Sequence, residues 1–323
     1  MEEKKLSKEQ IDLYIKEYLL PQFSRNYASY HFEITERGQR STIIYLSFKD
    51  FKPLVIKGTK KKRKIEHMLK GTHHLQNHCI KVPEIINLDL SKKTYKKFGC
   101  YFVCEEKIEG KVYEELDNPA DFLSLVAETF ARLHHVKRTD WGRIDSSKRH
   151  RLWSYLKGNI KEKLKNLSSY KKLFSLKQCD HYWQWFTTYK DTISGHKKFS
   201  LSHCDPHMHN VMVSNANEVY LLDVDALRYL PLSIDFYKLQ YNFCQDDAEK
   251  TGKWQQAYLS HLSKKEAEEF NKSKEFFHCY VLLDFAQRGA YNLTHPEDTT
   301  KYYHTCPLSL NKTQSLMDEI TKG

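Results

Sequence analysis

The stretch His-Cys-Asp-Pro-His-Met-His-Asn at residues 203–210, followed by Leu-Leu-Asp-Val-Asp at 221–225, decides the fold of this chain. An apolar run at 201–204 leads into the first stretch, so we predict a loop there. Two further apolar runs, 210–213 and 219–225, are separated by Ser-Asn-Ala-Asn at 214–217. Because Ser and Asn favour turns, we predict a β-hairpin whose second strand ends near Asp223.

The polar residues of these stretches have the spacing that phosphoryl transfer needs. His203, Asp205 and Asn210 fit the pattern H-x-D-x-x-x-x-N, and Asp223 follows at the end of the hairpin. Phosphoryl transfer requires a carboxylate beside the attacking hydroxyl and oxygen ligands for Mg²⁺ on the nucleotide phosphates. A loop and a hairpin that carry Asp, Asn and a second Asp can place these oxygens around one point.

An upstream strand supplies a candidate phosphate-binding cation. Lys57 ends the apolar run PLVIK at 53–57 and can reach nucleotide phosphates as a point charge. Glu66 follows on the next predicted helix, so we expect it to hold Lys57 by an ion pair. In the segment 36–42, Gly38 would allow close backbone approach to phosphates and Ser41 would offer a hydroxyl.

With these motifs, the chain resembles the aminoglycoside phosphotransferase and choline kinase superfamily, which shares the protein-kinase fold. The family signature H-G-D-x-x-x-x-N, followed by I-D-x-[DE], is matched by HCDPHMHN and LLDVD. YFVCEEKIEG (101–110) resembles the family's hinge strand, and FARLHHV (130–136) resembles its helix that ends in L-A-R-L-H. The chain departs from the signature with Cys204 in place of Gly and with His at positions 207 and 209.

The resemblance implies a role for each matched residue. Asp205 would accept or orient the proton of the acceptor hydroxyl, while Asn210 and Asp223 would hold Mg²⁺. Lys57 would contact the α- and β-phosphates with Glu66 as its brace. Backbone groups from Glu105 to Lys107 would bind adenine, and Asp225 would be the second acidic residue of the signature. His203 would pack within the catalytic loop, and Asp235 would support that loop.

The predicted fold is α+β and bilobal, of the protein-kinase-like type, with the active site between the lobes. A small sheet-rich N-lobe (1–108) would contain strands within 31–48, 53–57 and 99–108 and helices at 8–20 and 63–76. A larger, mainly helical C-lobe (109–323) would contain the hairpin. Its helices are expected from the spacing of apolar residues at 122–133, 150–168, 179–191, 235–245, 264–285 and 312–321.

Composition limits the class of protein without choosing the substrate. The chain is 40% hydrophobic and carries 52 Lys and Arg against 41 Asp and Glu, which favours a globular protein with an anionic partner. We interpret the run Lys60–Lys64 as a solvated turn, so there is no clear nucleic-acid site. Eight cysteines without a C-x-x-C pair indicate reduced thiols. We find neither a signal core nor a transmembrane segment, and so predict a cytoplasmic protein of unknown oligomeric state.

These patterns together predict an enzyme that moves the γ-phosphate of ATP or GTP, with Mg²⁺, to a hydroxyl of a small molecule. The acceptor would be sugar-like, an amino alcohol or aminoglycoside-like. One alternative is a metal-dependent hydrolase that uses His203, Asp205, His207 and His209 as ligands. It leaves Lys57 and the LLDVD strand unexplained. The other alternative is a pseudokinase scaffold, against which stands the presence of every expected catalytic residue type.

Overall fold

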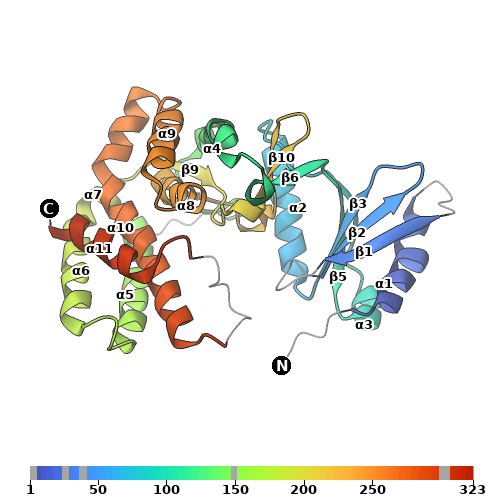
Figure 1. Cartoon of the computed structure of the whole chain (residues 1–323), viewed down its shortest axis with the longest axis horizontal. Coiled ribbons are helices and arrows are strands. Elements are labelled where there is room, and N and C mark those ends of the chain that lie inside the picture. The colour runs from blue at the N-terminus through green and yellow to red at the C-terminus, as the bar shows by residue number, and fades with distance from the viewer. Residues whose placement is uncertain (1–5, 24–28, 36–41, 147–150, 298–305, 323) are drawn as a thin grey trace. The chain divides into compact units, whose positions relative to one another are not determined.

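The computed structural model describes residues 6–23, 29–35, 42–146, 151–297 and 306–322, and the chain divides into two compact units (Figure 1). The first unit comprises Met1–Lys111 and Met212–Ala226, and the second comprises Val112–Val211 and Leu227–Gly323. The hairpin that we expected in the C-lobe therefore clusters with the first unit. Among the described residues, no helix is both long and apolar enough to cross a membrane.

The first unit is built on a five-stranded sheet with the order β1-β2-β3-β5-β4, in which all neighbouring strands are antiparallel. Its elements are α1 (Lys8–Tyr14), β1 (Tyr30–Thr35), β2 (Thr42–Phe48), β3 (Leu54–Thr59), α2 (Lys62–Gln76), β4 (Ile85–Asp89), α3 (Lys92–Phe98) and β5 (Tyr101–Glu106). The predicted helix 8–20 is α-helical only to Tyr14 and continues as a π-helical turn, Ile15–Leu19.

The two faces of this sheet have different roles. Leu54 and Ile56 of β3 are buried in one cluster with Ile11 and Tyr14 of α1. Because side chains alternate between faces along a strand, Lys57 and its neighbour Val55 belong to the opposite face. The hydrophobic cluster thus anchors the sheet on one side and leaves the other side to a polar site.

The predicted hairpin is present as β10 (Val211–Ser214) and β11 (Val219–Leu221), and it forms a three-stranded sheet with β6 (Gly110–Val112) in the order β11-β10-β6. A Cβ atom at Gly110 would lie 2.2 Å from the carbonyl oxygen of Val213, so only glycine allows this approach. The amide of Asn215 also donates to the carbonyl of Glu109 over 2.9 Å. These contacts explain why the hairpin clusters with the first unit.

The second unit combines helices with a four-stranded sheet of order β7-β9-β12-β8. Its elements are α4 (Leu123–His135), β7 (Lys137–Arg138), β8 (Gly142–Arg143), α5 (Leu152–Ser169), α6 (Leu176–Thr188), α7 (Lys190–Ser194), β9 (Phe199–Ser202), β12 (Arg228–Leu230), α8 (Leu232–Cys244), α9 (Ala248–Leu259), α10 (Lys264–Thr294) and α11 (Leu310–Lys322).

Helix α8 lies in the core of the second unit. The ring of Phe236 lies 5.0 Å from that of Tyr258, on α9, and 5.0 Å from that of Phe270, on α10. Burial of such aromatic side chains contributes a few kcal/mol each, roughly 2–3. The sequence had not predicted α9, whose segment AEKTGKWQQAYL has few apolar residues; Asp247 caps it by accepting from the amide of Lys250.

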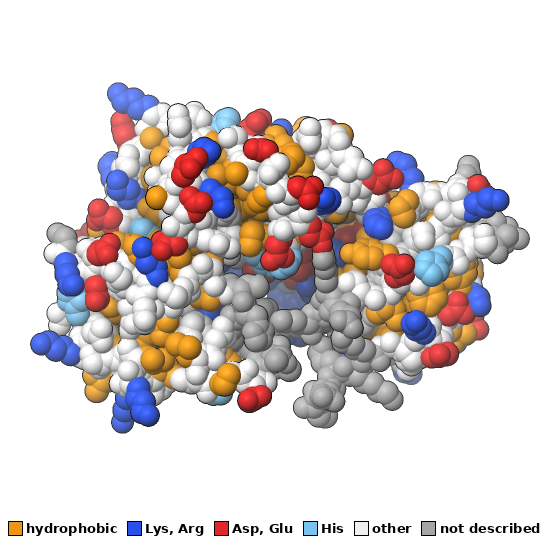
Figure 2. All heavy atoms as spheres, viewed as in Figure 1, with side chains coloured by type: hydrophobic (Ala, Val, Ile, Leu, Met, Phe, Trp, Pro, Cys, Tyr) orange, Lys and Arg blue, Asp and Glu red, His pale blue; other side chains and the backbone are white. Residues whose placement is uncertain are grey.

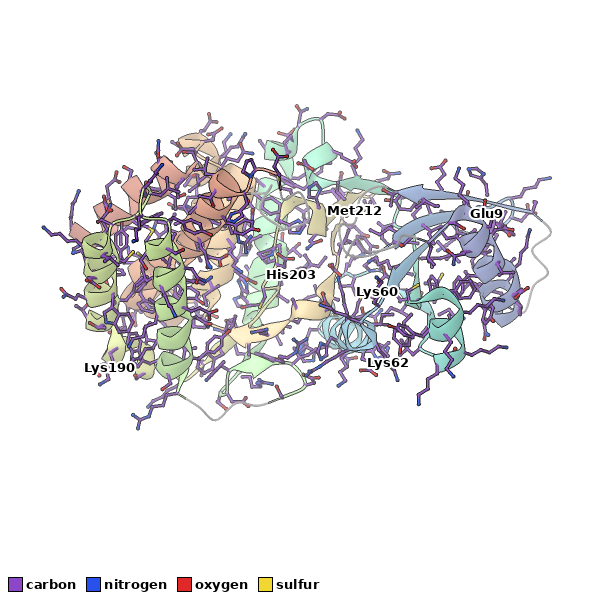
Figure 3. All side chains as sticks on the ribbon, turned by 90° about the horizontal axis from the view of Figure 1, so that it is seen from below. Glu9, Lys60, Lys62, Lys190, His203 and Met212 are labelled. Atoms are coloured by element: carbon purple, nitrogen blue, oxygen red, sulfur yellow. The ribbon has the colours of Figure 1, made fainter. Side chains whose placement is uncertain are left out.

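Charge is distributed rather than concentrated on the surface shown in Figure 2. Lys and Arg side chains alternate there with Asp and Glu side chains, and no single positive patch covers that face. The run Lys60–Lys64 is not wholly a turn as we had expected, because α2 already begins at Lys62 (Figure 3).

Candidate active site

The loop 203–210 is held in place by two residues of α8. Asp235 accepts hydrogen bonds from the backbone amides of His203, at 2.5 Å, and Cys204, at 3.2 Å. One helical turn later, the ammonium group of Lys238 donates to the carbonyl of Cys204 over 2.7 Å. One helix thus supplies the partners of two amides and one carbonyl at the start of this loop.

Asp235 itself is buried and depends on a histidine of α4. The Nε2 atom of His134 lies 3.5 Å from its carboxylate, and His134 Nδ1 lies 2.5 Å from the hydroxyl of Tyr258. Burial opposes ionisation of Asp235, but the nearby His134 and the charges of Lys238 and His203 lower its pKa. His134 is the histidine of the segment FARLHHV, to which the sequence analysis had assigned no role.

The remainder of the loop presents Asp205 and orders Asn210. The side chain of Asp205 is 54% exposed and lies 3.8 Å from His207 Nε2. The side-chain amide of Asn210 donates to the carbonyl of Asp205 over 3.0 Å. Since its nitrogen is turned to the loop, its Oδ1 is the atom that would bind a cation. His203 is buried, in keeping with a packing role.

In the first unit, Lys57 pairs with Glu105. Its Nζ lies 2.6 Å from Oε2 of Glu105, and the side chains are 20% and 5% exposed. The two residues share a face of neighbouring strands, because Val55 is opposite Glu105 and Lys57 is opposite Val103. Burial alone would lower the pKa of Lys57, but the carboxylates of Glu105, Asp223 and Asp225 raise it.

The expected ion pair between Lys57 and Glu66 was therefore wrong. Glu66 lies 3.7 Å from Lys62 on its own helix, and its side chain is 44% exposed. Helix α2 buries Ile65 and Met68, which directs Glu66 away from the core. Glu105 could have been found in the sequence as the carboxylate within an apolar strand, but we had considered only its backbone.

Asp223 and Asp225 follow β11 in an unusual backbone conformation. Asp223 has a φ of 52°, in the left-handed region, which ends the strand. The 3-10 turn Val224–Ala226, which contains Asp225, packs against α2. Lys64 of α2 lies 3.1 Å from Oδ2 of Asp223, so one member of the basic run is an ion-pair partner within the candidate site.

Two groups of predicted nucleotide contacts stay predictions. The amides of Glu106 and Lys107 donate to the carbonyls of Glu84, at 2.9 Å, and Pro53, at 3.0 Å. An adenine contact at these two residues would therefore use their carbonyl oxygens. Gly38 and Ser41 lie outside the described residues.

The donor atoms favour Mg²⁺ over zinc. His209 lies 3.0 Å from Glu114, and no group of three or more His, Cys, Asp or Glu residues in the described ranges is arranged to hold a metal ion. The hydrolase alternative needs such a group in the loop, all of which is described. Mg²⁺ instead takes one or two carboxylates with substrate phosphates and water, and the neighbouring carboxylates of Asp223 and Asp225 in the first unit fit that requirement.

Three features define a phosphotransferase of the protein-kinase-like fold. They are the lysine–glutamate pair within a sheet, the loop with Asp and Asn that a helix holds in place, and the carboxylates that follow a hairpin. The chain belongs to the phosphotransferase enzyme family, whose model matches residues 37–269. The predicted family, the α+β fold class and the phosphotransferase activity are thereby confirmed. No curated protein matches the sequence.

Solved structures show the same fold at low sequence identity. Aminoglycoside phosphotransferase APH(4)-Ia is 10% identical, with a TM-score of 0.66 over 98% of this chain and 99% of that one. An ethanolamine kinase of Plasmodium vivax is 13% identical, with a TM-score of 0.58 over 99% and 95% of the two chains. APH(2")-IIia, in a complex with GDP and kanamycin, is 13% identical, with a TM-score of 0.60 over 98% and 99%.

Proposed function

We propose that the protein is a Mg²⁺-dependent kinase that transfers the γ-phosphoryl group of ATP or GTP to a hydroxyl group of a small molecule. The observation that carries this proposal is the position of Lys57, held by Glu105 and within the field of Asp223 and Asp225. An ammonium group next to two candidate metal ligands is the arrangement that binds a metal-complexed polyphosphate.

In the first unit, Lys57 would bind the nucleotide phosphates. Its raised pKa keeps the ammonium group charged at neutral pH, and Glu105 fixes its direction. Asp223 and Asp225 of the same unit would hold Mg²⁺. When bound, that ion neutralises charge on the β- and γ-phosphates.

In the second unit, Asp205 would act on the acceptor. Its exposed carboxylate would accept a hydrogen bond from the acceptor hydroxyl and take its proton as the reaction proceeds. The hydroxyl oxygen forms a bond to the γ-phosphorus while the bond to the β,γ-bridging oxygen breaks, and the nucleoside diphosphate leaves. Catalysis is then mainly positioning and charge stabilisation, for which Asp235 and His134 keep the loop rigid.

The ligands named for similar structures support binding of a nucleotide and of a small acceptor with a hydroxyl group. They do not identify which nucleotide or which acceptor this chain uses. One APH(4)-Ia structure holds AMP-PNP and hygromycin B, and the APH(2")-IIia structure holds GDP and kanamycin. Both nucleotide types are therefore candidates for this chain. A cytoplasmic location stays a prediction.

The test separates the roles of the two aspartates. Asp205→Asn is expected to lower kcat by several orders of magnitude and to leave the affinity for the magnesium–nucleotide complex within a few-fold. Asp223→Asn should weaken metal-dependent nucleotide binding as well. Calorimetry with Mg²⁺ and non-hydrolysable analogues of ATP and GTP measures binding, and nucleotide consumption with a panel of alcohols measures turnover.

Asp180→Asn, at an exposed position of α6, is the matched control and should change neither quantity. Failure of the wild-type protein to bind either analogue in the presence of millimolar Mg²⁺ would contradict the proposed function. Normal turnover by Asp205→Asn would contradict the assigned mechanism.

A further inference from the structure

Two basic side chains flank the start of the catalytic loop on the second unit. Arg228, at the beginning of β12, is directly opposite Ser202, the last residue of β9 before the loop. Its Nη1 lies 3.3 Å from the hydroxyl of Tyr155 on α5. Lys238 of α8 donates to the carbonyl of Cys204, the residue that precedes Asp205. Burial raises the pKa of the Cys204 thiol, and the charges of Lys238 and Arg228 partly oppose this rise.

Two more cations join this group around a single carboxylate on α10. Arg288 Nη2 lies 2.8 Å from Asp284 Oδ2, and Lys163 of α5 pairs with the other oxygen of Asp284. Burial opposes ionisation of Asp284, yet Arg288, Lys163 and Lys238 hold its pKa far below the usual range. Arg228, Lys238, Lys163 and Arg288 are called the cation cluster below.

The cation cluster has more positive charge than its surroundings neutralise. Asp284 is shared by Lys163 and Arg288, while Asp235 is committed to His134 and to two backbone amides. Within the described part of the chain, neither Arg228 nor Lys238 forms an ion pair. Both side chains are only partly exposed, and a partly buried cation without a direct ion-pair partner is unfavourable.

This charge belongs to the unit that carries Asp205, and it is adjacent to that residue along the loop. A guanidinium group and an ammonium group at such a position match phosphate and carboxylate oxygens, the guanidinium in a two-point contact. An acceptor that carries an amine, which is cationic at neutral pH, would instead be repelled by the like charges of Arg228 and Lys238.

We propose that the cation cluster binds an anionic group of the acceptor, so that the substrate is an acidic alcohol, with a phosphate or a carboxylate, rather than an amino alcohol. This inference rests on the proposed kinase function and deepens it. Arg228 is the residue whose removal tests it best, because the only hydrogen bond of its side chain in the described structure is to Tyr155.

The first experiment compares matched acceptors with wild-type protein, Arg228→Gln and the control Arg132→Gln, an exposed arginine of α4. Glycerol 3-phosphate and glycerate are the phosphate and carboxylate arms, and glycerol and ethanolamine are the neutral and cationic arms. We expect kcat/KM at least tenfold higher for one of the acidic alcohols. Arg228→Gln should raise the KM for that acidic alcohol about tenfold or more and keep kcat within about threefold of wild type. Arg228→Lys should restore part of the lost affinity. Arg132→Gln should change neither KM nor kcat.

The second experiment needs no turnover. Inorganic phosphate is titrated calorimetrically into protein saturated with Mg²⁺ and a non-hydrolysable ATP analogue. Binding should weaken about tenfold or more in Arg228→Gln and stay unchanged in Arg132→Gln. Equal phosphate binding by both variants would mean an adventitious ion only and would overturn the inference, as would absence of phosphate binding or a preference for glycerol or ethanolamine. Loss of analogue binding in the preceding saturation step would instead refute the kinase function itself.

Discussion

The ammonium nitrogen of Lys57 lies 2.6 Å from Oε2 of Glu105 on the neighbouring strand, whereas Glu66 on α2 pairs with Lys62. Glu105→Gln should therefore weaken nucleotide binding about tenfold or more and lower the unfolding free energy by roughly 2–3 kcal/mol, because a mostly buried cation loses its counter-charge. Glu66→Gln is the matched control and should change both quantities little. Calorimetry with a non-hydrolysable analogue and denaturant unfolding decide between the two glutamates, and the reverse order of effects would contradict our assignment.

The pair between Lys64 and Asp223 predicts competition with Mg²⁺. Asp223 Oδ2 is 3.1 Å from Lys64 Nζ, and both side chains are about one-third exposed, 31% and 34%. If Asp223 binds the metal ion, this pair has to open. Lys64→Gln should then lower the Mg²⁺ concentration that half-saturates nucleotide binding, by up to about fivefold, since such pairs contribute at most about 1 kcal/mol. Lys62→Gln serves as the control. A higher Mg²⁺ requirement in Lys64→Gln would show that Lys64 assists phosphate binding instead.

The backbone conformation of Cys204 predicts an unusual order of stability among variants at this position. Its φ of 73° lies in the left-handed region that glycine adopts without strain, and glycine is the residue that the family signature has at this position. Cys204→Gly should be more stable than Cys204→Ala by about 1 kcal/mol, although it removes one more carbon atom. Cys204→Val should be the least stable, because a β-branched residue tolerates this conformation worst. Urea unfolding of the three variants tests this order; an alanine variant as stable as the glycine variant would exclude backbone strain as its cause.

His278 predicts a loss of stability in mild acid. Its ring stacks on Tyr237 at 4.2 Å between centroids and contacts the hydroxyl of Tyr241. Burial lowers its pKa to about 4, well below the ordinary value of 6.5. Because the unfolded chain takes up this proton first, the stability from a neutral His278 is complete above about pH 6.5 and is lost as the pH falls towards 4.

His278→Gln should remove part of this pH dependence, on the order of 1–3 kcal/mol between pH 7 and pH 4. His261→Gln, at an exposed position, should retain the wild-type slope. Urea unfolding as a function of pH provides the measurement. A wild-type slope in His278→Gln would assign the acid sensitivity to other groups.

Local sequence patterns were sufficient to predict a structural feature where that feature depends on a single element. The hairpin at β10 and β11 follows from two apolar runs around a turn sequence, and Gly110 ends the hinge segment because the carbonyl of Val213 leaves no space for a Cβ atom. Helix α10 continues to Thr294, beyond the predicted end at 285, since its final turns pack on α11 and such packing does not appear in local periodicity.

The sequence by itself determined the phosphotransferase family, the α+β fold class and the candidate chemistry of Asp205, Asn210 and Asp223, because these depend on residue types at fixed spacing within one loop and one hairpin. Only the tertiary structure decided which groups surround them. Glu105 rather than Glu66 pairs with Lys57, His134 contacts Asp235, and Arg228 and Lys238 flank the loop 203–210. Each of these contacts joins separate strands or helices, and the face on which a side chain lies is set by strand register and helix packing, which residue spacing along the chain does not specify.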